Sequence, residues 1–237
     1  MGAYEGKIAV VTGARKGLGR AIAGHLLDQG ARVLGLGREP AENAHPAYSH
    51  YRCDVRDAEA VRATFRQIGR DVPALHLLVN NSGVLTSQHS ILLAASSAEE
   101  MLMTNLLGPF LGSREAAKLM KRTPGGRIVH VGSMAAALEP SGDSIYAACK
   151  AGLETLANVL AKEYAGFGIT SNTVAVTAIE TDMLQKLPRD VLDGIIARLP
   201  IPRYAVEDDV MNVIDFFASE RSGYITAQTV YLGGLHR

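Results

Sequence analysis

Three side chains near the middle of the chain have types and spacings that suit proton transfer at an oxygen atom. Ser133 follows residues 127–131, an apolar, β-branched run that predicts a buried strand, so its hydroxyl is expected just past the strand's carboxyl end. Tyr146 opens an alanine-rich segment that predicts a helix to Tyr164, and Lys150 lies four residues later on the same helical face. A cation beside a phenol lowers the phenol's pKa. We therefore expect Tyr146 to exchange a proton with a carbonyl or alcohol oxygen that Ser133 hydrogen-bonds, with no metal needed.

Each of these residues also has a purely structural interpretation. A tyrosine followed four residues later by a lysine is weak evidence, because helical tyrosines often anchor a core and lysines usually only solvate a surface. Ser133 alone suits a turn or a helix cap. The rest of the chain has to decide between the two interpretations.

A glycine-rich turn near the N-terminus provides the first context. Residues 7–12 predict a short strand, Gly13, Gly17 and Gly19 follow it, and residues 20–29 predict a helix. Glycines let a pyrophosphate approach the backbone, and the N-terminus of a helix offers free N–H groups to an anion. A lone glycine-rich turn is weak evidence, but one that opens a strand–turn–helix unit predicts nucleotide binding.

The end of the second predicted strand indicates which nucleotide is bound. An acid there would bind the 2′-hydroxyl of NAD, but this chain has Gly37 in that slot, followed by Arg38. Arg15 and Lys16 add two bases from the glycine turn, and bases suit a 2′-phosphate, so we predict NADP(H). The alternative is that these bases only solvate the surface, and Glu39 is a mild signal against NADP.

The remaining pattern alternates strands with helices, which predicts a doubly wound parallel sheet of about seven strands. Further strands are expected at residues 32–36, 48–52, 75–79, 169–174 and 228–231, and further helices at residues 57–69, 97–120 and 207–218. Asn105 falls inside a predicted helix, where asparagine is unfavourable unless it is exposed, bonded to backbone or functional. Residues 177–205 are irregular and proline-rich around one short helix, as in a substrate lid.

Composition bounds the function. With 237 residues, 47% of them hydrophobic, the chain can form one large domain. A formal net charge of zero, with no long run of like charge, argues against nucleic acid or an anionic membrane as a partner. We find no membrane-spanning apolar run and no signal-peptide pattern, and expect a cytoplasmic protein. The two cysteines, Cys53 and Cys149, and the seven histidines show no disulfide or metal-site spacing.

Together these motifs resemble the short-chain dehydrogenase/reductase family over nearly the whole chain. The resemblance is carried, in the family's order, by residues 12–19, Asp54–Val55, residues 80–83, Asn105, Ser133 and Tyr146–Lys150. It implies a single-domain α/β fold over residues 1–237, a Rossmann-type doubly wound sheet flanked by helices. It also implies a catalytic tetrad of Asn105, Ser133, Tyr146 and Lys150. In that tetrad, Tyr146 is the general acid or base, Ser133 holds the substrate oxygen, Lys150 also binds the nicotinamide ribose, and Asn105 holds a water in the proton relay.

The same resemblance implies a set of cofactor-binding residues. They are Gly13, Arg15, Lys16, Gly17, Leu18, Gly19, Arg38, Asp54, Val55, Asn81, Tyr146, Lys150, Ile179 and Thr181. Asp54 would meet the adenine or merely cap the helix that follows. The chain departs from the family in having Val176 and Thr177 where a Pro-Gly pair is usual beside the nicotinamide, and Ser82 where alanine is usual.

Within the family, the chain looks most like the 3-oxoacyl-[acyl-carrier-protein] reductases, through residues 5–9, 150–153, 168–170, 179–183 and 224–226. This similarity implies an NADPH-dependent reduction of a 3-oxoacyl thioester, carried on acyl carrier protein, by a homo-oligomer that is a tetramer or a dimer. Phe167 stands where these reductases often have a base, so Lys118, Lys121 and Arg122 are the alternative docking patch, or else only complement a helix dipole.

Two other functions stay open at this point. One is a reductase or dehydrogenase of another ketone, a sugar or a secondary alcohol. The other is a nucleotide-binding scaffold without catalysis, against which the complete tetrad argues.

Overall fold

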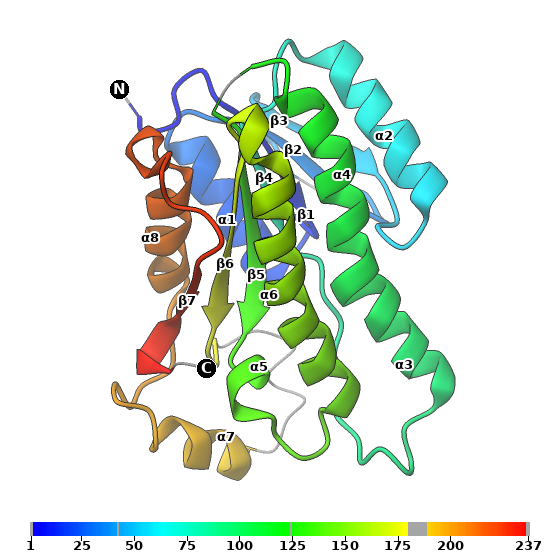
Figure 1. The fold of residues 1–237 in the computed structure, drawn as a ribbon, viewed down its shortest axis with the longest axis vertical. Helices are drawn as coiled ribbons and strands as arrows, with labels where there is room; N and C mark the ends of the chain where they lie inside the picture. Colours follow the sequence, from blue (N-terminus) through cyan, green and yellow to red (C-terminus); the bar gives the residue numbers. More distant parts are fainter. Residues whose placement is uncertain (1, 42, 124, 180–188, 236–237) are drawn as a thin grey trace.

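Seven parallel strands form one sheet with the order β3-β2-β1-β4-β5-β6-β7 (Figure 1). The computed structural model describes residues 2–41, 43–123, 125–179 and 189–235. The strands are β1 (Ile8–Thr12), β2 (Arg32–Gly37), β3 (Tyr48–Arg52), β4 (Leu77–Asn80), β5 (Arg127–Ser133), β6 (Thr170–Val176) and β7 (Thr229–Tyr231). The strand order reverses between β1 and β4, so the predicted doubly wound fold is confirmed.

Helices cover both faces of the sheet (Figure 1). They are α1 (Gly17–Asp28), α2 (Ala58–Asp71), α3 (Ala95–Leu102), α4 (Gly108–Met120), α5 (Ala135–Leu138), α6 (Ser144–Tyr164), α7 (Arg189–Ile196) and α8 (Glu207–Ala218). The helices α1 and α8 lie on one face, and α2, α4 and α6 lie on the other. None of the helices in the described residues is long and apolar enough to span a membrane.

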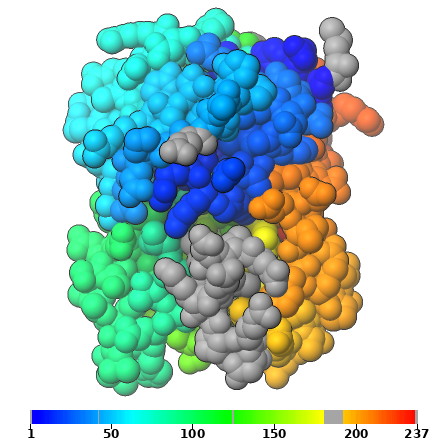
Figure 2. Space-filling view, turned by 180° about the vertical axis from the view of Figure 1, so that it is seen from behind, coloured from blue at the N-terminus to red at the C-terminus, as the bar shows by residue number. Residues whose placement is uncertain are grey.

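The carboxyl ends of β5 and β6 point toward one end of the molecule, where α5 and α7 lie (Figure 1). Seen from behind, green segments that include α3 and gold segments that include α7 lie on opposite sides of this end (Figure 2). Parallel strands place their carboxyl ends at one edge, and ligands of open α/β sheets bind at that edge. This end of the molecule is therefore where the predicted site residues should meet.

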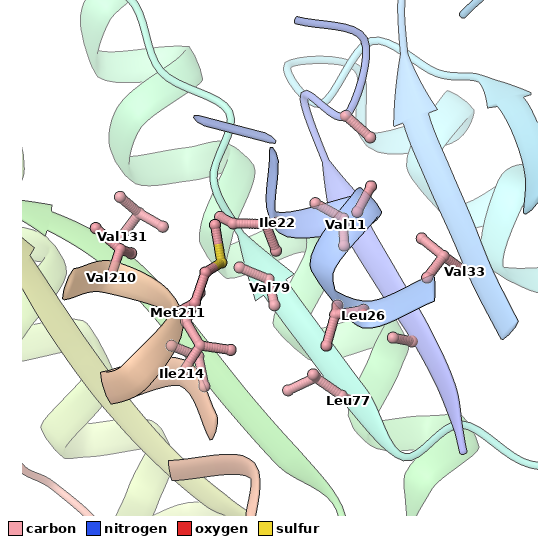
Figure 3. Packing of buried hydrophobic residues seen from close by; sticks show 14 of the residues in the cluster. Val11, Ile22, Leu26, Val33, Leu77, Val79, Val131, Val210, Met211 and Ile214 are labelled. Atoms are coloured by element: carbon pink, nitrogen blue, oxygen red, sulfur yellow. The ribbon is translucent and has the colours of Figure 1, made fainter. Parts of the chain in front are cut away.

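The strands are apolar on both faces because both faces are covered. Ile22 and Leu26 of α1 and Met211 of α8 pack against Val11 and Val79 of the central strands (Figure 3). Side chains alternate along a strand, so the neighbouring residues of β1 pack on the opposite face against α2 and α4. The two cores hold the sheet and hence the carboxyl ends of its strands in place.

The prediction of a single long helix over residues 97–120 is wrong in one detail. It is divided into α3 and α4 by a π-helical turn, η1 (Met103–Leu107), which contains Asn105. A π turn inserts an extra residue into the helical repeat and is common at functional sites. The sequence pattern gives no sign of it, because the flanking apolar residues fit an ordinary helix.

Candidate active site

Ser133 is held rigidly at the carboxyl end of β5. It is the last residue of the strand, not a residue just past the end as predicted, because the pairing with β6 extends to Ser133 and Val176. The residue is 7% exposed, and its Oγ accepts a hydrogen bond of 3.2 Å from the Ala135 N–H at the start of α5. The hydroxyl still has its own proton to donate, so it suits an oxygen atom of a ligand.

Tyr146 meets Ser133 from α6, as the sequence predicts. The Ser133 side chain lies close enough to the phenol to act on its pKa. Burial of the ring raises the pKa of Tyr146 to about 12, the Ser133 hydroxyl acts to lower it, and the charge of Asp143 raises it further. The expectation that Lys150 lowers this pKa is wrong for the protein by itself. The Lys150 Nζ lies 5.7 Å from the ring centroid, and burial, which raises the pKa, is the largest effect on the phenol.

Lys150 is a buried cation tied to the sheet. It is 5% exposed, and its Nζ donates a hydrogen bond of 2.8 Å to the carbonyl oxygen of Val131 in β5. Burial lowers the pKa of the ammonium group to about 8. The hydrogen bond directs the ammonium toward β5, to a carbonyl two residues before Ser133. The other two N–H groups of the ammonium remain able to donate.

Asn105 is brought to the same place by the π turn. Its side chain is fully buried, its Oδ1 accepts a bond of 2.9 Å from the Val84 N–H, and its Nδ2 donates one of 2.8 Å to the Val84 carbonyl oxygen. A side chain built on Gly83 would meet both Asn105 Oδ1, at 3.2 Å, and Lys150 Nζ, at 3.9 Å. The four predicted tetrad residues are therefore neighbours, while the water-holding role of Asn105 stays a prediction.

The glycine turn fits a phosphate group. Gly13 and Gly17 have φ of +69° and +51°, which side chains rarely adopt. A Cβ at Gly19 would lie only 2.2 Å from the carbonyl oxygen of Gly13, so only glycine fits there. The first turn of α1 contains no acid, and the N-cap residue Lys16 makes no side-chain cap hydrogen bond. The free N–H groups at the N-terminus of α1 are therefore available to an anion. Leu18 packs on the core of this face.

Thr12 braces this turn, a role that our interpretation of the sequence missed. Its Oγ1 accepts hydrogen bonds of 3.0 and 2.9 Å from the N–H groups of Asn81 and Ser82. The Asn81 Nδ2 in return donates to the Thr12 carbonyl oxygen at 2.9 Å. Asn81, predicted to contact the cofactor, thus fastens β4 to β1 beside the glycine turn. A β-branched hydroxyl at the last position of the first strand was the signal available.

The region expected to hold the adenosine ribose contains opposing charges. Arg15 forms an ion pair of 2.9 Å with Glu39, the acid that the sequence analysis counted against NADP, so the two charges partly neutralise each other. Arg38 is exposed. A Cβ on Gly37 would lie 3.3 Å from the His50 ring, so the ring crowds any side chain at the position where an acid is expected to bind a ribose hydroxyl.

Asp54 is engaged by its neighbour. Arg56 Nε and Nη2 donate to its carboxylate at 3.0 and 2.7 Å, and the Arg56 N–H donates to Oδ1 at 3.0 Å. These bonds, ahead of the more distant charge of Arg38, lower the pKa of Asp54. The helix α2 is capped by Asp57 instead, so the capping alternative for Asp54 is wrong. Val55 packs against Gly108 at the start of α4.

The predicted lid is described only in part. Ile179 is buried and forms a bridge to Ala205, and a pocket of about 380 Å³ lies beside them, lined also by Tyr204 and the first turn of α8. The short helix expected in this region is α7. Thr181, predicted to contact the cofactor, lies outside the described residues. Nowhere in the described ranges do three or more His, Cys, Asp or Glu side chains gather as metal ligands.

The chain is similar to known proteins over almost its whole length. A family model described as enoyl-(acyl carrier protein) reductase matches residues 13–236. The chain is 35% identical over 239 residues to the 3-oxoacyl-[acyl-carrier-protein] reductase FabG of Escherichia coli (strain K12), covering 98% of this chain and 97% of that protein. The identity to FabG of Vibrio harveyi is 34%, with 97% of each covered.

Solved structures of the same fold have other names. An aldohexose dehydrogenase of Thermoplasma acidophilum matches with a TM-score of 0.90 at 26% identity, covering 98% of this chain and 94% of the other. A short-chain dehydrogenase/reductase from Serratia marcescens matches with a TM-score of 0.89 at 30% identity, covering 98% of each. These matches extend across every element that carries the site.

Proposed function

The chain belongs to the short-chain dehydrogenase/reductase family and is an oxidoreductase acting on CH–OH and C=O groups, and we propose that it is an NADPH-dependent ketoreductase of 3-oxoacyl thioesters. The observation that carries this proposal is the meeting of Ser133, Tyr146 and Lys150 at the carboxyl end of β5. The names of the FabG relatives support the substrate class.

In the proposed reaction, the ketone oxygen accepts hydrogen bonds from the Ser133 and Tyr146 hydroxyls. With its pKa raised to about 12, Tyr146 is protonated at neutral pH and acts as the general acid that gives a proton to this oxygen. When bound, the dinucleotide supplies the hydride that the carbonyl carbon receives. Lys150 binds the nicotinamide ribose and helps to reprotonate Tyr146, and Asn105 positions the loop at Val84 beside it.

The general acid is tested by Tyr146→Phe, which keeps the ring and removes the proton. General acid–base catalysis contributes about 10² to 10⁴-fold, so turnover should fall by at least that factor while NADPH still binds. Lys150→Ala should impair both NADPH binding and rate. Near-normal turnover of the phenylalanine variant would contradict the proposed chemistry.

We propose NADP(H) rather than NAD(H) because Gly37 takes the position of the acid, Arg38 follows it, and the glycine turn adds Arg15 and Lys16. Each charge-assisted hydrogen bond to a 2′-phosphate is worth about 1.5 to 3 kcal/mol, so two imply a preference of about a hundredfold or more. The ion pair of Arg15 with Glu39 reduces the contribution of Arg15, which leaves Arg38 and Lys16 as the main determinants. Arg38→Asp should shift the preference toward NADH, and equal kcat/KM for the two cofactors in the wild type would refute the assignment.

The substrate class is tested by NADPH consumption with free ketones, sugars, short 3-oxoacyl thioesters and carrier-bound 3-oxoacyl groups. We expect the thioesters to be preferred. The aldohexose dehydrogenase neighbour supports the alternative, a dehydrogenase or reductase of a sugar or another ketone. If the protein reduces such compounds but no 3-oxoacyl thioester, that alternative would be favoured.

A carrier protein, if it delivers the substrate, would dock through Lys121 and Arg122, which are exposed just after α4. The end of α4 and the carboxyl end of β5 lie at opposite ends of the molecule (Figure 1), so docking there would serve the site of another copy in the proposed homo-oligomer. Lys118 is a weaker part of the predicted patch, because its Nζ is paired at 2.7 Å with the buried carboxylate of Glu115. The variant with Lys121→Glu and Arg122→Glu should lose kcat/KM, in a salt-sensitive way, for carrier-bound substrate only. Equal loss with a carrier-free thioester would remove this patch from the proposal. A cytoplasmic location and a homo-oligomer are parts of the same proposal.

A further inference from the structure

Asp143 stands directly before α6, where an aspartate usually caps the helix. Its side chain makes no cap hydrogen bond, and its backbone has φ of −109° and ψ of 26° rather than the extended shape of a cap. Asp57, at the same position of α2, shows the usual arrangement, because its Oδ1 accepts bonds of 2.9 and 3.0 Å from the N–H groups of Glu59 and Ala60. The carboxylate of Asp143 is therefore directed elsewhere.

The surroundings of this carboxylate leave one of its two oxygens unsatisfied. Asp143 is 9% exposed, and its Oδ1 is sealed from solvent without a hydrogen-bond partner in the described part of the chain. Burying a carboxylate without donors is unfavourable, and an unsatisfied polar group in a folded protein calls for a ligand, a water or an ion. A donor that arrives with a ligand meets this need.

Asp143 borders the proposed active site. It precedes Tyr146 by three residues, at the start of the same helix, and its charge acts on the phenol. The adjacent Gly142 accepts a bond of 2.8 Å from the Gln88 N–H, which ties this turn to the loop that carries Val84. A ligand that reaches Tyr146 past this turn passes Asp143.

We propose that the Asp143 carboxylate is a substrate-binding group that accepts a hydrogen bond from a donor outside the reacting carbonyl. In the 3-oxoacyl thioesters of the proposed function, the 3-keto carbon itself carries no such donor. The nearest one is the first amide N–H of the thioester arm, six bonds from the keto carbon. The assignment of that donor rests on the proposed function, whereas the need of the carboxylate for a donor does not.

The test compares two thioesters of equal length that differ in one group. One is 3-oxobutanoyl-N-acetylcysteamine, which has the amide, and the other is an S-alkyl 3-oxobutanethioate, which lacks it. A hydrogen bond to a charged acceptor corresponds to about a tenfold to hundredfold preference for the amide thioester, mainly in KM. Asp143→Leu should abolish the preference, and Asp143→Asn, which keeps an acceptor, should reduce it only partly. Because both variants change the charge beside Tyr146 for both thioesters, the ratio isolates the hydrogen bond.

Equal use of the two thioesters by the wild type, or a preference that survives in Asp143→Leu, would overturn the amide assignment. If neither thioester is reduced, the proposed function fails, and the same variants are then compared on acetoin and butanone, a ketone pair with and without a neighbouring hydroxyl. Loss of a preference for acetoin would assign the donor to a hydroxyl. No preference in either pair would overturn the role of Asp143.

Unfolding measurements separate this role from a structural one. An unpartnered carboxylate contributes no bond to the fold, so Asp143→Leu should leave the midpoint of thermal unfolding unchanged or higher. The matched variant Asp57→Leu removes a real cap and should lower the midpoint. A midpoint lowered as much by Asp143→Leu as by Asp57→Leu would show that Asp143 supports the fold instead.

Discussion

Replacing Lys150 with methionine should make the protein more stable at neutral pH while it destroys the proposed site. Burial lowers the pKa of Lys150 from its usual 10.5 to about 8. A difference of one in pKa corresponds to about 1.36 kcal/mol, so the folded state is penalised by about 3 kcal/mol for keeping this ammonium charged. Methionine has similar length and no charge. It leaves the carbonyl of Val131 without its partner, which costs about 1 kcal/mol, and a net gain of about 2 kcal/mol is expected.

The sign of the pH dependence follows from the lowered pKa. Below pH 8, Lys150 is protonated in both the folded and the unfolded chain, and the full penalty is present. As the pH rises from about 8 to 10.5, the folded protein loses this proton before the unfolded chain does, and the penalty disappears. The stabilising effect of Lys150→Met should therefore turn into a small loss near pH 11, since only the missing bond to Val131 remains.

The assay is urea unfolding of the cofactor-free wild type and variant at about pH 7 and about pH 11, with the difference in free energy of unfolding taken at each pH. The effect of the missing hydrogen bond is the same at both values, so the change between them isolates the charge and should be about 3 kcal/mol. Lys162→Met, an exposed lysine of the same helix, is the matched control and should show little effect at either pH. Equal effects of Lys150→Met at both pH values would refute the reasoning.

Three further predictions concern other parts of the molecule. Ala227 has φ of 57°, so Ala227→Gly should raise the free energy of unfolding by about 1 kcal/mol in urea titrations, and a loss would show that the turn is not strained. Gly37→Asp should improve NADH affinity in a fluorescence titration, and adding His50→Ala should improve it further, because the His50 ring crowds a Cβ at Gly37. Equal affinities of the single and double variants would contradict this. Asp143 raises the pKa of Tyr146, so Asp143→Asn should move the alkaline loss of ketone reduction to lower pH, and an unmoved profile would exclude this charge effect.

The alternation of strands and helices and the location of most site residues were predictable from the sequence. The strand β3 and the helix α8 begin and end where the sequence predicts, and for α8 the reason is a local apolar periodicity whose residues are buried. The glycine turn was predictable for the same reason, since Gly13 and Gly17 adopt backbone angles that the chain needs right there. Ser133 and Tyr146 were placed correctly because the carboxyl end of a parallel strand always reaches the same edge.

The tertiary structure alone decided how these residues act on one another. The expected lowering of the Tyr146 pKa was wrong, because burial raises this pKa. Burial depends on every neighbouring element, and the spacing of four residues between Tyr146 and Lys150 does not report it. The π turn at Asn105 and the unsatisfied carboxylate of Asp143 have no local signal, since an ordinary helix and an ordinary cap fit the same letters. Periodicity reports which face of an element is buried, whereas hydrogen-bond partners and pKa values depend on contacts between segments far apart in the chain.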